Sequence, residues 1–273
     1  MSILYDTHLH TSFSPDSDTD ISEQIEKAKS VNLSGICITD HTDYLFPFDK
    51  NISAENPFVF DVDKYFESIK KQAEDNPSFT VLTGVEIGLQ NDKNVICLND
   101  KLLSNHAFDE VIGSIHVVDN KDPYYPDFWE GNNHKELLKQ YFELTLENLN
   151  AFSDIDILGH LDYAVRYMPK ESVYDPKEFF EITDEIMVFL IKNDIALEIN
   201  TSGLKKGYGF TNPHPELIKR YYELGGRLIS IGSDAHSPDA VAFAFDALSE
   251  ELISYGFKEY AVFKTRNIEL KKL

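Results

Sequence analysis

The sequence predicts an α/β protein whose parallel strands close into a barrel. Short apolar runs alternate with longer segments of helical periodicity along the chain, which is the pattern of a parallel sheet covered by helices. About seven such units fit into the 273 residues, and that number is enough to close a barrel. We find no Gly/Ser linker, tandem repeat or low-complexity segment, so we expect residues 1–273 to form a single barrel domain.

The expected elements follow one another in strand–helix order. Apolar runs predict strands at residues 3–6, 35–39, 80–85, 110–115, 155–158, 196–199 and 227–231. Helical periodicity lies between them, at residues 21–31, 62–76, 134–152, 176–192, 213–224 and 238–255. Ser22 provides capping chemistry for the first helix, and Asp175 with Pro176 does so for the fourth. Two further strand-like runs, residues 94–98 and 259–263, do not fit the alternation.

Two long loops follow candidate strands, on the side of a barrel where active sites are built. Both loops are rich in aromatic residues: Phe46, Phe48, Phe58 and Phe60, with Pro47 among them, in loop 44–61, and Tyr124, Tyr125, Phe128 and Trp129 in loop 119–133. These side chains either line a pocket or pack over the mouth of the barrel, and the sequence leaves both alternatives open.

The charge of the chain disfavours polyanionic partners. The formal net charge is −22, and so acidic a surface repels nucleic acids and membrane surfaces. A small anionic substrate remains compatible with it, because bound metal ions reverse the sign of a local field. We therefore expect a small phosphorylated substrate, no nucleic acid and no membrane partner, and a monomer or small homo-oligomer.

Cysteine usage and the chain start indicate a cytoplasmic protein. Cys37 and Cys97 both lie in apolar runs, which favours buried, reduced thiols over a disulfide. The first ten residues lack the basic and apolar regions of a secretory signal. No apolar run reaches the roughly 18 residues that a membrane span requires.

Six of the nine histidines come at or just after the end of a predicted strand: His8, His10, His41, His116, His160 and His236. Because the carboxyl ends of parallel strands open on one face of a barrel, we expect these side chains to converge. The pairs His8/His10, His160/Asp162 and Asp234/His236 are two residues apart, so in a strand each pair points to one face. Imidazole and carboxylate ligands together suit zinc, iron or manganese.

Carboxylates at other strand ends extend this set. Glu86 follows the strand at 80–85 and can bridge two metal ions, and Asp16 lies in the loop after the first strand. Asp6 and Asp40 either orient a ligating imidazole or accept hydrogen bonds from the backbone, and both alternatives stay open. The remaining histidines, which fall at helix ends or in loops, are interpreted as solvated or capping residues: His106, His134 and His214.

Six motifs occur in a characteristic order: H-x-H at residues 8–10, T-D-H at 39–41, G-V-E at 84–86, S-I-H at 114–116, G-H at 159–160 and S-D-A-H at 233–236. Together they resemble the polymerase-and-histidinol-phosphatase (PHP) family, from residue 5 to residue 236. The segments GHLDYAVRY (159–167) and LEINTSG (197–203) are most similar to its histidinol-phosphatase members. The resemblance implies a distorted (β/α)7, TIM-like barrel of the PHP type. It also implies hydrolysis of L-histidinol phosphate to L-histidinol and phosphate, a step of histidine biosynthesis.

The resemblance further implies two or three divalent metal ions. By this correspondence one ion is held by His8, His10, Glu86 and Asp234, a second by Glu86, His116 and His160, and a third by Asp16, His41 and His236. Many relatives have histidine at the position of Asp16. A carboxylate there is a harder ligand and favours iron or manganese.

The expected reaction is in-line attack on phosphorus by a metal-bound hydroxide. Three divalent ions, three carboxylates and one hydroxide leave a charge of about +2, which balances a phosphomonoester dianion. Arg166 is expected either to clamp the phosphate or to form a surface ion pair. Asn200 and Lys205 are weaker candidates for substrate contact, and Asp162, Asp234 and His236 are candidates for protonating the leaving alkoxide.

Four alternatives change the substrate or the chemistry. The first is a phosphoesterase of the same family that acts on nucleotides, sugar phosphates or cyclic phosphodiesters. The second is the exonuclease module of a DNA polymerase, which the net charge of −22 disfavours. The third is a non-catalytic metal-binding barrel. An amidohydrolase-type barrel also has strand-end H-x-H, but no lysine ends a middle strand here to form its metal bridge.

Overall fold

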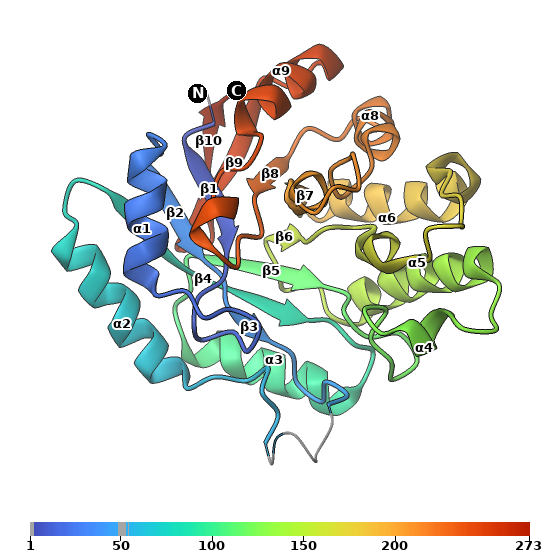
Figure 1. Cartoon of the computed structure of the whole chain (residues 1–273), viewed down its shortest axis with the longest axis horizontal. Helices are drawn as coiled ribbons and strands as arrows, with labels where there is room; N and C mark the ends of the chain where they lie inside the picture. The colour runs from blue at the N-terminus through green and yellow to red at the C-terminus, as the bar shows by residue number, and fades with distance from the viewer. Residues whose placement is uncertain (1–2, 49–52, 54) are drawn as a thin grey trace.

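A sheet of eight strands forms the centre of the computed structural model, which describes residues 3–48, 53 and 55–273. Seven strands are neighbours in the order β1-β2-β4-β5-β6-β7-β8, and β3 pairs with β4 beyond the end of β2 (Figure 1). All pairs in this sheet are parallel. The strands are β1 (Tyr5–Leu9), β2 (Gly35–Ile38), β3 (His41–Thr42), β4 (Thr80–Gly88), β5 (Glu110–Ser114), β6 (Ile157–Leu158), β7 (Ala196–Asn200) and β8 (Ile229–Gly232).

The first and last strands of the sheet meet and nearly close it. Leu9 forms an isolated parallel bridge with Ala235, just beyond the end of β8. The backbone N–H of Asp234 donates to the carbonyl of His8 over 2.8 Å, and that of His10 donates to the carbonyl of Ala235 over 2.9 Å. The structure is therefore a nearly closed barrel of seven parallel strands, which confirms the predicted fold class.

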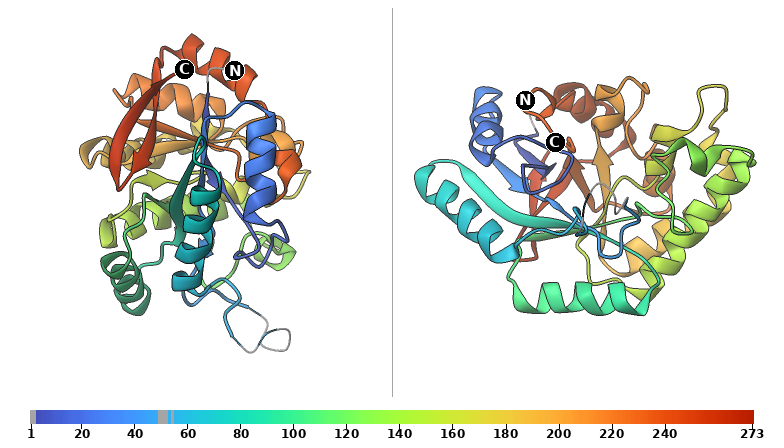
Figure 2. Two further views of the ribbon diagram at one scale, coloured as in Figure 1. Left: turned by 90° about the vertical axis from the view of Figure 1, so that its left-hand side faces the viewer. Right: turned by 60° about the horizontal axis from the view of Figure 1, so that its bottom comes forward.

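Helices surround the barrel, as the two views of Figure 2 show. The longer ones are α1 (Ile21–Ser30), α2 (Val62–Asp75), α3 (Lys93–Asn105), α5 (His134–Ala151), α6 (Phe180–Lys192), α8 (Pro215–Glu223) and α9 (Phe245–Tyr255). The short ones are α4 (Pro126–Trp129), α7 (Ser202–Lys205) and the 3-10 helices η1 (Tyr163–Tyr167), η2 (Pro176–Phe179) and η3 (Pro238–Ala240). In the described part of the chain, none of these helices has the length and apolarity that crossing a membrane requires.

Of the two helix caps predicted from the sequence, one is confirmed and one is wrong. Helix α1 is capped by Asp20, whose side chain accepts from the backbone N–H of Ser22 over 2.8 Å. The backbone N–H of Asp20 donates to the carboxylate of Glu23 over 3.2 Å, so the two residues form a capping box. Ser22 is therefore not the cap, whereas Asp175 caps η2 as expected.

The strand-like run at residues 94–98 is helical, and the strand interpretation of it was wrong. It lies in α3, which begins after the N-cap residue Asp92. Val95, Asn99 and Leu102 are buried, at the spacing of one helix face. Cys97 lies on another face and is exposed, so the expectation that both cysteines are buried holds for Cys37 only; both thiols are free.

The run at residues 259–263 does form a strand, but outside the barrel. It is β9 (Glu259–Lys264), which pairs antiparallel with β10 (Asn267–Lys272) in a separate two-stranded sheet. The hydroxyl of Tyr260 in β9 accepts a hydrogen bond from the N–H of Leu4 over 2.9 Å. The hairpin thus packs against the amino-terminal end of β1, away from the strand ends that carry the histidines.

Candidate metal centre

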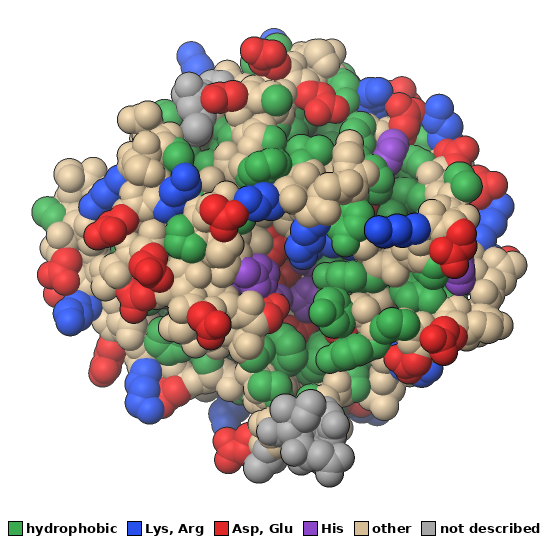
Figure 3. Space-filling model, in the orientation of Figure 1, with side chains coloured by type: hydrophobic (Ala, Val, Ile, Leu, Met, Phe, Trp, Pro, Cys, Tyr) green, Lys and Arg blue, Asp and Glu red, His purple; other side chains and the backbone are tan. Residues whose placement is uncertain are grey.

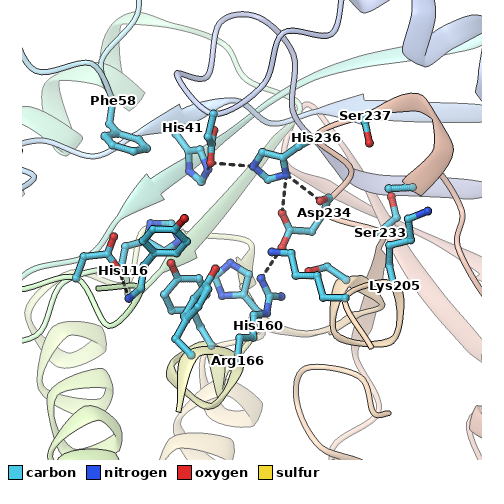
Figure 4. Close-up of a pocket in the computed structure, with 18 of the residues that line it drawn as sticks. His41, Phe58, His116, His160, Arg166, Lys205, Ser233, Asp234, His236 and Ser237 are labelled. Atoms are coloured by element: carbon cyan, nitrogen blue, oxygen red, sulfur yellow. Dashed lines mark hydrogen bonds and ion pairs between the residues drawn. The ribbon is translucent and has the colours of Figure 1, made fainter. Parts of the chain in front are cut away.

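The predicted metal ligands gather at the carboxyl ends of the barrel strands. They come from β1 and its following loop (His8, His10, Asp16), β3 (His41), β4 (Glu86), the residues after β5 and β6 (His116, His160), and the segment after β8 (Asp234, His236). Figure 3 shows histidine and acidic side chains at the bottom of a hollow in this face, and Figure 4 shows several of them pointing into it.

The first group consists of His8, His10, Glu86 and Asp234. The Nε2 atoms of His8 and His10 are 3.0 Å apart. Oε2 of Glu86 lies 3.4 Å from the first nitrogen and 3.5 Å from the second. Oδ1 of Asp234 lies 3.9 Å and 3.4 Å from the same nitrogens. A tetrahedral ion with bonds of about 2.0–2.1 Å separates its ligand atoms by about 3.3–3.4 Å, so this donor set fits a divalent metal ion.

The second group shares Glu86 with the first. Oε1 of Glu86 lies 2.9 Å from Nε2 of His160 and 3.4 Å from Nε2 of His116. The hydroxyl of Ser114 donates to the same oxygen over 2.6 Å, which fixes the carboxylate. Because the two oxygens of Glu86 face different groups of nitrogens, this residue has the geometry of a bridging ligand.

The third group is more open. Oδ2 of Asp16 lies 3.1 Å from Nε2 of His236 and 3.7 Å from Nε2 of His41. The side chain of Asp16 is 47% exposed, whereas Glu86 is fully buried. The rings of His41 and His236 both lie beside that of His10, so the third group is adjacent to the first.

The charges in the centre keep the carboxylates ionised. Burial alone would raise the pKa of Glu86, but nearby imidazoles, His8 first among them, hold it well below its usual value. Burial would likewise raise the pKa of Asp234, yet the guanidinium of Arg166 holds it far below. Burial and two neighbouring imidazoles lower the pKa of His10, so its ring is neutral. Burial would also lower the pKa of His8 and of His41, but the neighbouring carboxylates hold the first well above its usual value and raise the second to about 9. Because metal ions bind ionised carboxylate and neutral imidazole, an ion that binds to these two rings must displace a proton.

Other carboxylates orient the imidazoles from behind. Glu198 in β7 lies 2.6 Å from Nδ1 of His8, and Asp43 lies 2.9 Å from Nδ1 of His116. Such contacts fix the ring orientation and raise the basicity of the other nitrogen. Neither residue was predicted from the sequence. Their only signals are a carboxylate inside the apolar run ALEIN and an aspartate two residues after His41.

Asp6 and Asp40 both accept hydrogen bonds from the backbone, and Asp40 also contacts a residue beside a metal ligand. Asp6 accepts hydrogen bonds from the backbone of Ser233 and Ala242 over 2.8 and 2.9 Å, and no imidazole bonds to it among the described residues. Asp40 accepts from the hydroxyl of Ser14 over 2.6 Å, and Ser14 in turn lies 3.1 Å from Nδ1 of His10. Asp6 therefore fits the backbone alternative. Asp40 fits both alternatives, because it accepts from the backbone N–H of Thr11 over 2.7 Å and reaches His10 through Ser14.

Arg166 is buried rather than on the surface. It lies on η1, and its Nη1 donates to Oδ2 of Asp234 over 2.8 Å. Nη2 donates to the side-chain oxygen of Asn200 over 2.9 Å, and Nε donates to that of Asn212 over 2.8 Å. The surface ion pair considered for Arg166 is therefore excluded by its burial.

Two of the proposed substrate or catalytic residues lie beneath the cavity. Asp162 is fully buried and accepts hydrogen bonds from the side chain of Asn212 and the backbone of His214. Asn200 is also fully buried, between Arg166 and Glu198. Neither side chain lines the cavity: Asn200 accepts from Arg166, and Asp162 holds Asn212, which accepts from Arg166 in turn. Burial raises the pKa of Asp162 to about 6.

A cavity of about 480 Å³ opens above the three groups. Metal-ligand candidates form its floor, and Arg166, Lys205 and Lys206 line one part of its wall. Both long loops contribute, the first with Phe46 and Phe58 and the second with Asp122, Tyr124 and Tyr125. Both alternatives for these loops hold in part, because Phe128 and Trp129 are buried in the core and Phe60 packs against it.

The other histidines stay outside the donor groups of the described residues. His214 caps α8 by accepting from the N–H of Glu216 over 3.2 Å. His106 follows α3 and its Nδ1 lies 3.0 Å from the carbonyl of Leu102, and His134 begins α5. The interpretation as solvated or capping residues holds for His214 and for His106, which is the C-cap residue of α3. It fails for His134, which is half-buried beside the hydroxyl of Ser172 and follows the N-cap residue Asn133.

Comparisons with known proteins agree with this geometry. The family model for the PHP domain matches residues 6–202. A probable histidinol-phosphatase of Clostridium acetobutylicum is 38% identical, over 89% of this chain and 90% of that protein. A histidinol-phosphatase of Lactococcus lactis is 28% identical, over 98% of this chain and 97% of that protein.

The structural comparison covers nearly the whole chain. A crystal structure of histidinol phosphate phosphatase from Lactococcus lactis, in complex with zinc, L-histidinol and phosphate, superposes with a TM-score of 0.86 at 26% identity. The match covers 98% of this chain and 99% of that one, so it includes Asp234 and His236, which follow the region of the family model. This chain therefore belongs to the PHP domain family.

Proposed function

We propose that this protein is a metal-dependent phosphomonoesterase that hydrolyses L-histidinol phosphate to L-histidinol and phosphate. The observation that carries the proposal is the cluster of histidine, glutamate and aspartate side chains, in four overlapping sets of three donors among the described residues, on the floor of a cavity with cationic side chains in part of its wall. The relatives named as histidinol-phosphatases match along almost the whole chain, and the Lactococcus lactis structure holds zinc, L-histidinol and phosphate.

Three divalent ions, of zinc, iron or manganese, are the occupants that we assign to the donor groups. His8, His10, Glu86 and Asp234 hold the first, Glu86, His116 and His160 the second, and Asp16, His41 and His236 the third. When bound, such ions supply the water activation and the phosphoryl polarisation that ester hydrolysis requires. The protein's part is to fix the donors and to exclude other ligands from the buried first and second groups.

Cationic side chains receive the phosphate in this proposal. Arg166 lines the cavity, and its guanidinium is held in one orientation by Asp234, Asn200 and Asn212. A guanidinium so fixed presents its N–H groups to phosphate oxygens without losing further freedom on binding. Lys205 lies at the rim, where its ammonium group pairs with Asp239 over 2.5 Å.

Fewer residues can donate the proton to the leaving alkoxide than the sequence suggested. Asp162 does not reach the cavity, and Asp234 is held ionised beside Arg166. His236 lines the cavity, but its Nε2 faces Asp16 in the third donor group. His236 can therefore protonate the leaving group only in molecules whose third group holds no ion.

The direct test is metal analysis combined with phosphate release. We expect the purified protein to release phosphate from L-histidinol phosphate much faster than from a panel of nucleotides and sugar phosphates. Replacing Glu86 by alanine should abolish turnover and remove the metal ions of the first two groups. Glu67→Ala, at an exposed position of α2, is the control and should change neither. A clearly better nucleotide substrate, or near-normal turnover in Glu86→Ala, would contradict the proposal.

A further inference from the structure

The hairpin of β9 and β10 presents an open strand edge on the side of the barrel away from the metal centre. Among the described residues β10 pairs only with β9, so it is the outer strand of a two-stranded sheet at the periphery of the molecule (Figure 2). Beyond the ladder with β9, no hydrogen bond of these described residues involves the backbone of Ile268, Leu270 or Lys272. Unpaired backbone groups along such an edge can be satisfied by water or by a strand from another chain.

The register of the hairpin identifies which backbone groups point outward. Leu273 continues the ladder beyond the end of β10, and its N–H donates to the carbonyl of Lys258 over 3.0 Å. Hydrogen-bonded and non-hydrogen-bonded pairs alternate along an antiparallel ladder, so every second residue, counted back from Leu273, bonds to β9. The residues between them direct their N–H and C=O groups to the open edge: Ile268, Leu270 and Lys272.

Apolar side chains lie along this open edge. Ile268 is 43% exposed and Leu270 is 54% exposed. Their cross-strand partners in β9 are Phe263 and Ala261, which are buried in a cluster with residues of β5, β6 and β7. Because residues directly opposite each other in an antiparallel pair lie on one face of the sheet, the apolar face of the hairpin continues from the core to the molecular surface. A strand that adds to the edge would cover this exposed part.

The charges of β10 are complementary to a second copy of the same strand. If two copies pair antiparallel about a two-fold axis at Leu270, then Glu269 of each copy lies opposite Lys271 of the other. An axis at Glu269 or at Lys271 would instead place like charges opposite each other, which is destabilising. Within one chain Lys271 pairs with Glu269 over 2.9 Å, so both side chains already lie on one face of the strand. A two-fold symmetric contact requires this kind of self-complementary surface.

We propose that two copies of this chain associate through β10, in antiparallel pairing about a two-fold axis at Leu270. The two hairpins then form one four-stranded sheet, in which the N–H of each Leu270 donates to the carbonyl of Leu270 in the other copy. A ladder of six residues buries less than the roughly 1,200 Å² of a stable interface, so we expect a weak dimer with a Kd of about 1–100 µM. The inference does not depend on the proposed function.

Charge reversal tests both the surface and its register. Glu269→Lys and Lys271→Glu each place like charges across the axis, so we expect each variant alone to dimerise with a Kd about 10- to 100-fold higher than that of wild type. An equimolar mixture of the two variants should dimerise as wild type does, because every lysine then faces a glutamate of the other chain. The double variant, which exchanges the two charges, is the matched control and should also dimerise as wild type does. Sedimentation velocity over a series of protein concentrations measures each Kd.

Leu270→Pro tests the backbone pairing separately. The N–H that this variant removes points to the open edge, so the ladder with β9 keeps its hydrogen bonds while the dimer loses those at the axis. We expect a monomer with a melting temperature close to that of wild type. A wild-type protein that stays monomeric at several times the upper end of the expected Kd range would overturn the inference. Dimers of wild-type affinity in Leu270→Pro or in the single charge variants, or a mixture of those variants that stays monomeric, would overturn it as well.

Discussion

Glu198 connects two metal ligands at the scale of single residues. Its Oε1 lies 2.6 Å from Nδ1 of His8, and its Oε2 accepts from the backbone N–H of His160 over 2.6 Å. One carboxylate thus sets the orientation of a ligand in the first donor group and of the segment that carries a ligand in the second. Its position explains how strands far apart in the sequence present their imidazoles in register.

We expect Glu198→Gln to weaken metal binding by about 10- to 100-fold, because an amide orients and polarises the imidazole of His8 less than a carboxylate does. Titration of the metal-depleted protein with zinc, followed by calorimetry, measures the affinity. Glu250→Gln, at an exposed position of α9, controls for the loss of one negative charge. An unchanged zinc affinity in Glu198→Gln would show that His8 is oriented by other contacts.

The sequence predicts ligands better than it predicts the residues behind them. His8, His116 and Glu86 could be placed because the rule for parallel strand ends needs only the position of each strand. Glu198 could not, because all five residues of β7 are buried and no alternation indicates which side chains face inward. The ligand assignments themselves stay predictions until metal is measured.

At the scale of elements, β8 approaches β1 closely at Gly232. A Cβ atom added there would collide with Cβ of His8 and lie 2.6 Å from Oε1 of Glu198. Glycine therefore allows the last strand to pass directly behind a metal ligand. This contact couples the packing of the strands to the geometry of the first donor group.

Gly232→Ala should therefore lower both stability and metal affinity. We expect a loss of about 1–3 kcal/mol in the free energy of unfolding, as for other overpacked core positions, with weaker zinc binding as well. Gly113→Ala crowds Ile155 and Leu89 at 2.8 and 2.9 Å instead, so it should cost stability but leave zinc affinity intact. Denaturant unfolding and zinc titration of both variants make the comparison. Equal zinc affinities in the two variants would argue against the coupling.

Element boundaries were predicted where periodicity decides and missed where it is ambiguous. The order of seven strands and the helices between them is confirmed. Residues 94–98 are a short apolar run, which periodicity alone does not assign to strand or helix. The N-cap at Asp92 and the buried positions Val95, Asn99 and Leu102 identify the helix only when a longer window is considered.

At the scale of the whole molecule, the metal centre concentrates negative charge in an already acidic protein. The net charge is −22, and Glu86 and Asp234 are buried in the barrel with Glu198 beside them. Bound cations offset this repulsion and stabilise the folded state, because the unfolded chain lacks the assembled site.

Removal of metal should consequently lower the melting temperature. A free metal concentration of 100 times Kd stabilises the folded state by about 2.7 kcal/mol for each site. This corresponds to an increase in Tm of about 5–10 °C for a chain of this size class. Differential scanning calorimetry with and without a chelator measures the change, and excess zinc should restore the original Tm. A Tm that does not respond to the chelator would mean that the donor groups bind no ion strongly.

The meeting of β1 with the segment after β8 has a consequence for the order in which the protein is made. His8 and His10 leave the ribosome more than two hundred residues before Asp234 and His236. During synthesis the two histidines are therefore present before the other ligands of the centre, and any ion that they bind has an incomplete set of ligands. The complete centre can form only when the segment after β8 docks beside β1. Metal therefore binds to the complete centre only after this segment has been synthesised.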